Sequence, residues 1–190
     1  DLFDDEAINL AAVALVARYC ERFPLGIWFI YGNHEHRRNF AAIDAALDGT
    51  QIHKLVNGAA LLMDAPRPLW LVGIDYPQAH GDEAFQAKKK EYTDTAYQDV
   101  PENAITILLS HHPEGIDNGA THGAALALTG HTHGCQFGIL GHAALPFFKY
   151  NRGIVHVGST FGYVHSGNGS WFPYRIGCPP EIAYFTLRRA

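Results

Sequence analysis

Three short apolar segments that lie far apart in the chain each end in a polar cluster containing histidine. Residues 25–31 run into Gly-Asn-His-Glu, residues 104–110 into His-His-Pro, and residues 124–129 into Gly-His-Thr-His. Apolar runs of this length predict buried strands. In layered α/β folds the ends of such strands meet along one edge of a sheet. The pattern therefore predicts an α/β fold that brings histidines from three distant segments together.

The segments between these strands fit the same fold class. No internal repeat or linker is visible, so we expect one domain over residues 1–190. Asn57-Gly58 predicts a hairpin turn between two strands. The first helix is expected to bury the stripe formed by Ile8, Ala11, Ala12, Leu15 and Tyr19. Further helices are expected at 39–47 and 82–98, further strands at 52–56, 59–63, 69–74, 153–158 and 182–187, and an ordered loop at 159–180.

Charge and cysteine content restrict the classes of partner. The formal net charge is -5, the pI is about 6.2 and no basic stripe is present, so nucleic acid is not a favoured partner. Cys20, Cys135 and Cys178 are widely spaced and form no CxxC pair, which predicts reduced thiols and a reducing or redox-neutral compartment. No run of 18 apolar residues or signal peptide is visible, so none of these residues is expected to span a membrane.

The residue types at the strand ends indicate a metal centre. Histidine and asparagine together with aspartate offer mixed nitrogen and oxygen ligands. That mixture suits Mn, Fe, Zn or Co and does not suit calcium, which prefers oxygen ligands alone. Gly32 and Gly130 allow the tight turns that aim these side chains.

The clusters resemble, in order, three motifs of the calcineurin-like metallophosphoesterases. These are residues 32–35, 110–113 and 130–133, and Asp1-Leu2 is similar to the end of a fourth motif, Gly-Asp. A fifth motif, Asp-x-His, is expected upstream of Asp1. The similarity covers essentially the whole chain. It extends to the C-terminal third, which resembles the small single-domain bacterial phosphodiesterase branch, whose members often carry an N-terminal membrane segment.

The resemblance implies a fold and a location. The fold implied is a four-layer α/β/β/α sandwich of the metallophosphoesterase type, whose N-terminal part, with the first metal motif, is missing from these residues. The location implied is cytoplasmic, or membrane-associated through an N-terminal anchor outside these residues. The implied partner is a small-molecule or lipid-linked phosphoester.

The resemblance also assigns roles residue by residue. Asp1 matches the carboxylate that bridges two metal ions, and His133 matches a ligand of the first ion. The other ligands of the second ion match Asn33, His111 and His131. His111 is preferred to His112 because the family pattern is His-x-Pro.

Two further residues have expected roles outside the ligand set. His34 matches a histidine that contacts the phosphate without binding metal, and we expect it to be catalytic by stabilising charge or protonating the leaving oxygen. Arg175 is a candidate for substrate binding because a guanidinium group matches phosphate in a bidentate manner. Glu35 is expected to orient His34.

The function implied is hydrolysis of a phosphodiester or phosphomonoester by a metal-bridging hydroxide. Two divalent ions would act together, with manganese first among the candidates and iron, zinc or cobalt as alternatives. Purple acid phosphatase is excluded because Asp4 stands where that family has tyrosine. Two alternatives stay open. One is a lipid-sugar nucleotide pyrophosphatase of the same fold, and the other is a non-catalytic fragment that binds metal and phosphate.

Overall fold

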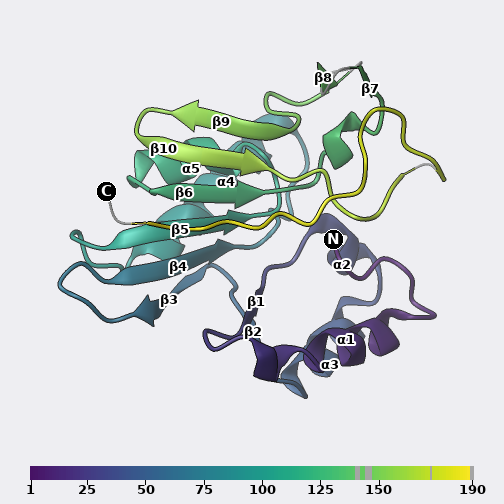
Figure 1. Ribbon diagram of the computed structural model, residues 1–190, viewed down its shortest axis with the longest axis horizontal. Coiled ribbons are helices and arrows are strands. Elements are labelled where there is room, and N and C mark those ends of the chain that lie inside the picture. Colours follow the sequence, from purple (N-terminus) through teal and green to yellow (C-terminus); the bar gives the residue numbers. More distant parts are fainter. Residues whose placement is uncertain (140–141, 144–146, 172, 189–190) are drawn as a thin grey trace.

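A six-stranded mixed sheet in the order β3-β4-β5-β6-β10-β9 forms the larger part of the molecule (Figure 1). The computed structural model describes residues 1–139, 142–143, 147–171 and 173–188. β4, β5, β6 and β10 run parallel, and β3 and β9 pair antiparallel at the two edges. The strands are β3 (Gly58–Met63), β4 (Leu69–Ile74), β5 (Ile105–Ser110), β6 (Leu126–Thr129), β9 (Gly153–Val157) and β10 (Thr160–Val164).

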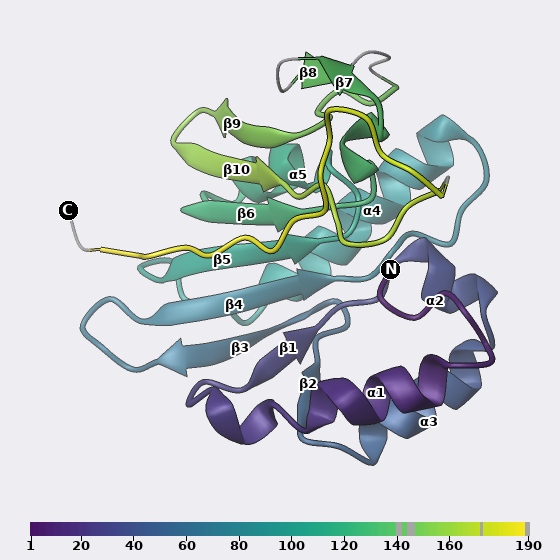
Figure 2. The ribbon, with the colours of Figure 1, turned by 45° about the vertical axis from the view of Figure 1, so that its right-hand side comes forward.

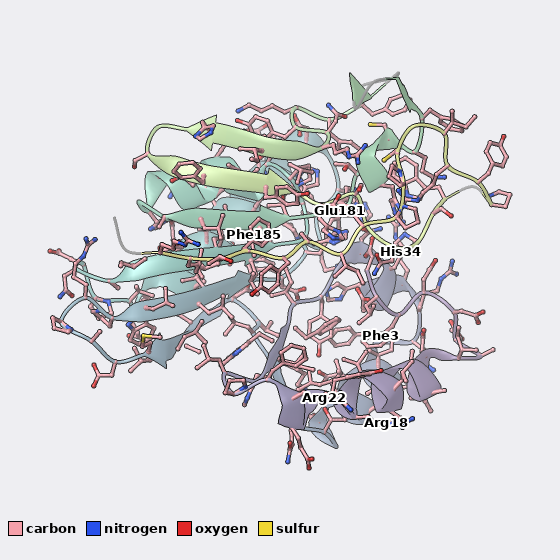
Figure 3. The ribbon with its side chains drawn as sticks, in the orientation of Figure 1. Phe3, Arg18, Arg22, His34, Glu181 and Phe185 are labelled. Carbon is pink, nitrogen blue, oxygen red and sulfur yellow. The ribbon has the colours of Figure 1, made fainter. Side chains whose placement is uncertain are left out.

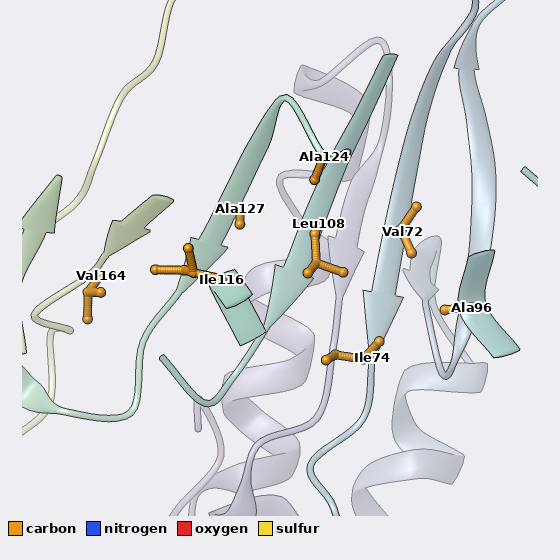
Figure 4. Packing of buried hydrophobic residues seen from close by; sticks show 8 residues of the cluster. All are labelled: Val72, Ile74, Ala96, Leu108, Ile116, Ala124, Ala127 and Val164. Atoms are coloured by element: carbon orange, nitrogen blue, oxygen red, sulfur yellow. The ribbon is translucent and has the colours of Figure 1, made fainter. Parts of the chain in front are cut away.

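Two helices cover one face of this sheet, and they lie behind it in Figure 1. They are α4 (Asp82–Tyr97), which contacts β4, and α5 (Gly115–Thr121), which contacts β6. The side chains between them form a core with exposed fractions of 2% or less (Figure 4). Leu108 of β5 is fully buried at its centre, beside Ile116 of α5. The middle strands read as continuous apolar runs because strands buried on both faces need no polar alternation.

A smaller unit lies below the large sheet in Figures 1 and 2. Its two parallel strands, β1 and β2, pack against α1 and α3 around Phe3, Val13 and Tyr31. The elements of this unit are α1 (Asn9–Ala17), a 3-10 turn at Cys20–Arg22, β1 (Ile27–Phe29), α2 (Asn33–Arg37), α3 (Phe40–Asp48) and β2 (Ile52–Lys54). The remaining elements are a 3-10 turn, η2 (His133–Cys135), and the short pair β7 (Gly138–Ile139) and β8 (His142–Ala143).

The predicted hairpin at Asn57-Gly58 is wrong. β2 pairs with β1, whereas β3 pairs with β4, so the turn connects two different sheets. Asn57 does adopt the left-handed backbone that favours such a turn, with φ of 49°. Its side-chain oxygen accepts a hydrogen bond from the Asp75 amide, 2.9 Å away, which fixes the chain at the end of β4.

The predicted buried stripe of α1 is also wrong. Ile8, Leu15 and Tyr19 are 58%, 53% and 47% exposed, while Val13 is the buried apolar side chain of the helix. α1 is apolar on nearly all sides, so periodicity does not single out the face that meets α3.

The C-terminal segment differs from the predicted pattern as well. Residues 182–187 form no strand and lie extended across the sheet face opposite α4 and α5, over β5 (Figure 1). Phe185 rests on the Tyr163 ring, with ring centroids 5.1 Å apart. A strand, β10, instead occupies the start of the predicted loop at 159–180. The α/β class is confirmed, and the four-layer arrangement stays a prediction.

Candidate active site

Strands β5 and β6 place two of the histidine clusters next to each other. Ser110 at the end of β5 is the register partner of Thr129 at the end of β6. The chains stay together beyond the sheet, because the Gly130 amide donates to the His111 carbonyl oxygen over 3.1 Å. The side chains of His111 and His131 therefore emerge side by side at the edge of the sheet.

Four side chains from separate segments meet at one atom, Nε2 of His111. It lies 2.9 Å from Oδ2 of Asp1, 3.0 Å from Oδ1 of Asn33 and 2.8 Å from Nδ1 of His131. Asn33 is the first residue of α2, which follows β1, and Asp1 lies beside it. The ligand atoms of Asp1, His111 and His131 all lie within 4.8 Å of one another. The arrangement brings together four of the five residues predicted as metal ligands.

The protonation of this cluster fits a bound cation. Burial, above all, lowers the pKa of His111 well below its usual value. Burial and the neighbouring His111 lower the pKa of His131 to about 2, so both rings are neutral at pH 7. Nε2 of His111 carries at most one proton and can donate only one hydrogen bond to its three neighbours, which are Oδ2 of Asp1, Oδ1 of Asn33 and Nδ1 of His131. Lone pairs of nitrogen and oxygen therefore face one another in this cluster. Neutral imidazoles with a carboxylate and an amide oxygen are a donor set for a borderline divalent metal ion.

Glu35 holds the Asp1 segment in place rather than the His34 ring. Its fully buried carboxylate accepts hydrogen bonds from the amides of Leu2 (2.6 Å), Phe3 (2.8 Å) and Gly32 (2.8 Å). Burial raises the pKa of Glu35, but the hydrogen bonds from these backbone amides act in the opposite direction, and the pKa stays below its usual value. The expectation that Glu35 orients His34 is wrong, because three backbone groups use its oxygens instead.

The His34 ring is oriented by Asp4, a residue that the sequence reasoning missed. His34 is labelled in Figure 3. Its Nδ1 lies 2.5 Å from Oδ1 of Asp4, and its Nε2 lies 3.9 Å from Oδ2 of Asp1. Nε of Arg38 also donates to Asp4, over 3.0 Å. Burial raises the pKa of Asp4, but the hydrogen bonds from His34 and Arg38 hold it below its usual value. The sequence feature that could have indicated this contact is the position of Asp4, three residues after the expected ligand Asp1.

His133 lies outside the four-residue cluster. Its Nδ1 faces the Gly169 carbonyl oxygen at 3.2 Å, and its ring packs 4.8 Å from the Trp171 ring. Burial, above all, lowers its pKa. Metal ligation by His133 thus stays a prediction.

Arg175 contacts backbone carbonyl oxygens. Its Nη1 atom donates to the oxygens of His133 (3.1 Å) and Cys178 (3.3 Å), and its Nη2 atom donates to those of Ser166 (2.9 Å) and Gly169. These bonds tie the loop that follows β10 to η2 and occupy both terminal nitrogens. In the structure Arg175 therefore holds backbone segments together. Its contact with substrate stays a prediction, which these hydrogen bonds do not favour.

Comparison with known proteins identifies relatives across most of the chain, although no protein-family model matches it. An uncharacterized metallophosphoesterase of Helicobacter pylori is 33% identical over 193 residues, covering 96% of this chain and 48% of the relative. The uncharacterized metallophosphoesterase YkuE of Bacillus subtilis is 28% identical over 180 residues, covering 87% of this chain and 57% of the relative. The chain belongs to the calcineurin-like metallophosphoesterase superfamily.

Membership of the metallophosphoesterases confirms the resemblance carried by the three histidine motifs. The chain spans about half the length of the curated relatives that it matches. One of them, from Bos taurus, is named a transmembrane protein with a metallophosphoesterase domain and is 28% identical over 208 residues, covering 100% of this chain and 45% of the relative. Within the described part of this chain, no helix is long and apolar enough to cross a membrane.

Proposed function

We propose that this chain is the catalytic part of a hydrolase that cleaves phosphodiesters or phosphomonoesters with two divalent metal ions. The observation that carries the proposal is the convergence of Asp1, Asn33 and His131 on Nε2 of His111, within 3.0 Å. Neutral nitrogen and carboxylate ligands at the end of parallel strands are suited to manganese, with iron, zinc and cobalt as alternatives.

Within this proposal, the four clustered side chains hold one ion, and Asp1 together with His133 contributes to the other. Divalent ions bound here supply an activated nucleophile and positive charge beside the phosphoryl oxygens. The preceding Asp-x-His motif that the resemblance implies would complete the first ligand set.

His34 is the proposed general acid. Its Nδ1 is engaged by Asp4, so Nε2 is the nitrogen that faces Asp1, 3.9 Å away. A proton on Nε2 can pass to the leaving oxygen of the ester, and the Asp4 carboxylate stabilises the imidazolium form that precedes this transfer. Arg38 fixes Asp4 in turn, through its 3.0 Å hydrogen bond.

The test combines metal analysis with hydrolysis. The protein is loaded with manganese, zinc or magnesium, its metal content is measured by mass spectrometry, and release of p-nitrophenolate from bis(p-nitrophenyl) phosphate and from p-nitrophenyl phosphate is followed with and without chelator. Two ions per chain and hydrolysis that the chelator abolishes support the proposal. One ion or none, with phosphate binding but no hydrolysis, would establish the non-catalytic binding protein instead.

A lipid-linked phosphoester or pyrophosphate is a second candidate substrate. The observation that favours it is a cavity of about 430 Å³ that begins at Asp1 and His111. The residues that line it include the apolar side chains Leu109, Leu128 and Phe185. Hydrolysis of a lipid-linked pyrophosphate at a rate well above that of bis(p-nitrophenyl) phosphate would select this candidate. Phe172, in the predicted loop at 159–180, lies outside the described residues.

A further inference from the structure

Four aromatic side chains form a wall beside the His131 ring. We name Tyr76, Phe85, His112 and Phe148 the aromatic wall. The rings of Phe148 and His112 lie 5.3 Å from the His131 ring, and the Tyr76 ring lies 5.9 Å from it. Phe85 joins the others at 5.0 Å from His112 and 5.4 Å from Tyr76. The wall therefore borders the proposed metal centre directly.

The wall is assembled from four separate segments. Tyr76 follows β4, Phe85 lies in the first turn of α4, His112 follows β5, and Phe148 precedes β9. All four residues are half-buried. Contacts between rings from four segments give a continuous surface rather than one protruding side chain.

Hydrogen bonds fix the backbone that carries two of these rings. The Tyr76 amide donates to Oδ1 of Asp75 over 2.7 Å, and the Asp75 amide donates to Asn57 over 2.9 Å. The Phe148 amide donates to Oδ1 of Asn151 over 3.2 Å. A surface held in this way is ordered before a ligand arrives, which reduces the entropy lost on binding.

The wall contains no carboxylate, lysine or arginine side chain. Lys89 lies buried behind it, 5.7 Å from the Phe85 ring centroid, and pairs with Glu114 at 3.2 Å. Nδ1 of His112 accepts a hydrogen bond from the Glu114 amide over 3.4 Å. The Tyr76 hydroxyl has no hydrogen-bond partner among the described residues. A ligand here meets the aromatic rings and two polar atoms, the Tyr76 hydroxyl and Nε2 of His112.

We propose that the aromatic wall is the subsite for an organic group of the phosphoester and that it selects a flat ring, either an aryl group or a nucleobase. The inference rests on the proposed function, because it places the phosphoryl group beside His111 and His131. Flat rings stack on aromatic side chains with a free energy that corresponds to roughly tenfold or more in affinity.

The test uses two inert phosphonates that differ only in the ring. Binding of phenylphosphonate and of methylphosphonate to the manganese-loaded protein is measured by isothermal titration calorimetry. We expect phenylphosphonate to bind about tenfold more tightly. Tyr76→Leu and Phe148→Leu should each remove most of this advantage. Phe23→Leu is the matched control, because Phe23 is 53% exposed and lies far along the chain, before β1; it should keep the parent ratio.

The outcomes separate this inference from the function beneath it. Equal affinities in the parent protein, or an unchanged ratio in both leucine variants, would overturn the inference even if diesters are hydrolysed. A ring preference that both variants lose supports it even if no hydrolysis is seen, and the proposed function alone then fails. Thermal unfolding checks each variant, and because Tyr76 and Phe148 lie on different segments, one folded variant is enough to decide.

Discussion

Nδ1 of His34 lies 2.5 Å from Oδ1 of Asp4, across a separation of 30 residues in the chain. This contact fixes the rotation of the imidazole and turns Nε2 toward Asp1. Since a hydrogen bond on one ring nitrogen sets which nitrogen faces the site, Asp4 is a positioning residue for the proposed general acid.

The first prediction concerns Asp4. Asp4→Asn keeps the size of the side chain but removes the charge that stabilises the imidazolium form of His34. We expect turnover to fall about 10- to 100-fold, with unchanged metal content. Asp4→Glu should restore part of the rate. If Asp4→Asn lost bound metal, the carboxylate would have to be reinterpreted as part of the metal centre.

The second prediction concerns His34 itself. His34→Ala should lower turnover by about 10²- to 10⁴-fold, the range typical of a lost general acid. Metal occupancy should stay at the parent level, because neither ring nitrogen of His34 belongs to the cluster around His111. Mass spectrometry of the purified variant gives the occupancy. A variant that loses metal would identify His34 as a ligand.

The third prediction concerns the metal cluster. His131→Ala or Asn33→Ala should each empty the second metal site, since each removes an atom within 3.0 Å of Nε2 of His111. Metal content should drop by about one ion per chain, and hydrolysis should fall by orders of magnitude. His156→Ala, on the edge strand β9, is the matched histidine control. Near-parental rates in His131→Ala would argue against a two-metal mechanism.

The fourth prediction concerns Glu35. Its buried carboxylate accepts hydrogen bonds from three backbone amides. Glu35→Gln leaves a single acceptor oxygen and places an NH2 group against backbone N–H groups, so donors face donors. We expect the free energy of unfolding to fall by about 2–4 kcal/mol, measured by urea denaturation. Glu83→Gln, an exposed residue at the start of α4, should change it by less than about 0.5 kcal/mol. Equal stability of the two variants would contradict this role.

The fifth prediction concerns the main core. Leu108 is 0% exposed, and Leu108→Ala should cost about 2–5 kcal/mol of unfolding free energy through lost burial and a residual cavity. Leu61→Ala on the edge strand β3, where the side chain is 46% exposed, should cost clearly less. Denaturation midpoints of the two variants, measured side by side, make the comparison. A similar cost at both positions would contradict the assigned core.

The sequence determined the features that depend on neighbouring residues and on repeated patterns. Continuous apolar runs predicted β4, β5 and β6, and the polar pattern at 82–98 predicted α4. Histidines in the segments that follow two of these strands were expected to converge, and the register of Ser110 with Thr129 explains why His111 and His131 do so. Each of these outcomes follows from local chain geometry and from the parallel alignment of strands.

Only the tertiary structure decided which groups meet across long separations. The partner of β2, the buried face of α1 and the hydrogen bonds of Glu35 depend on contacts that no local pattern encodes. α1 is apolar on most sides, so packing against α3 selected Val13 where periodicity pointed to Ile8 and Leu15. Asp4 reaches His34 for a similar reason, because the buried Glu35 carboxylate fixes the backbone of residues 2 and 3 beside α2.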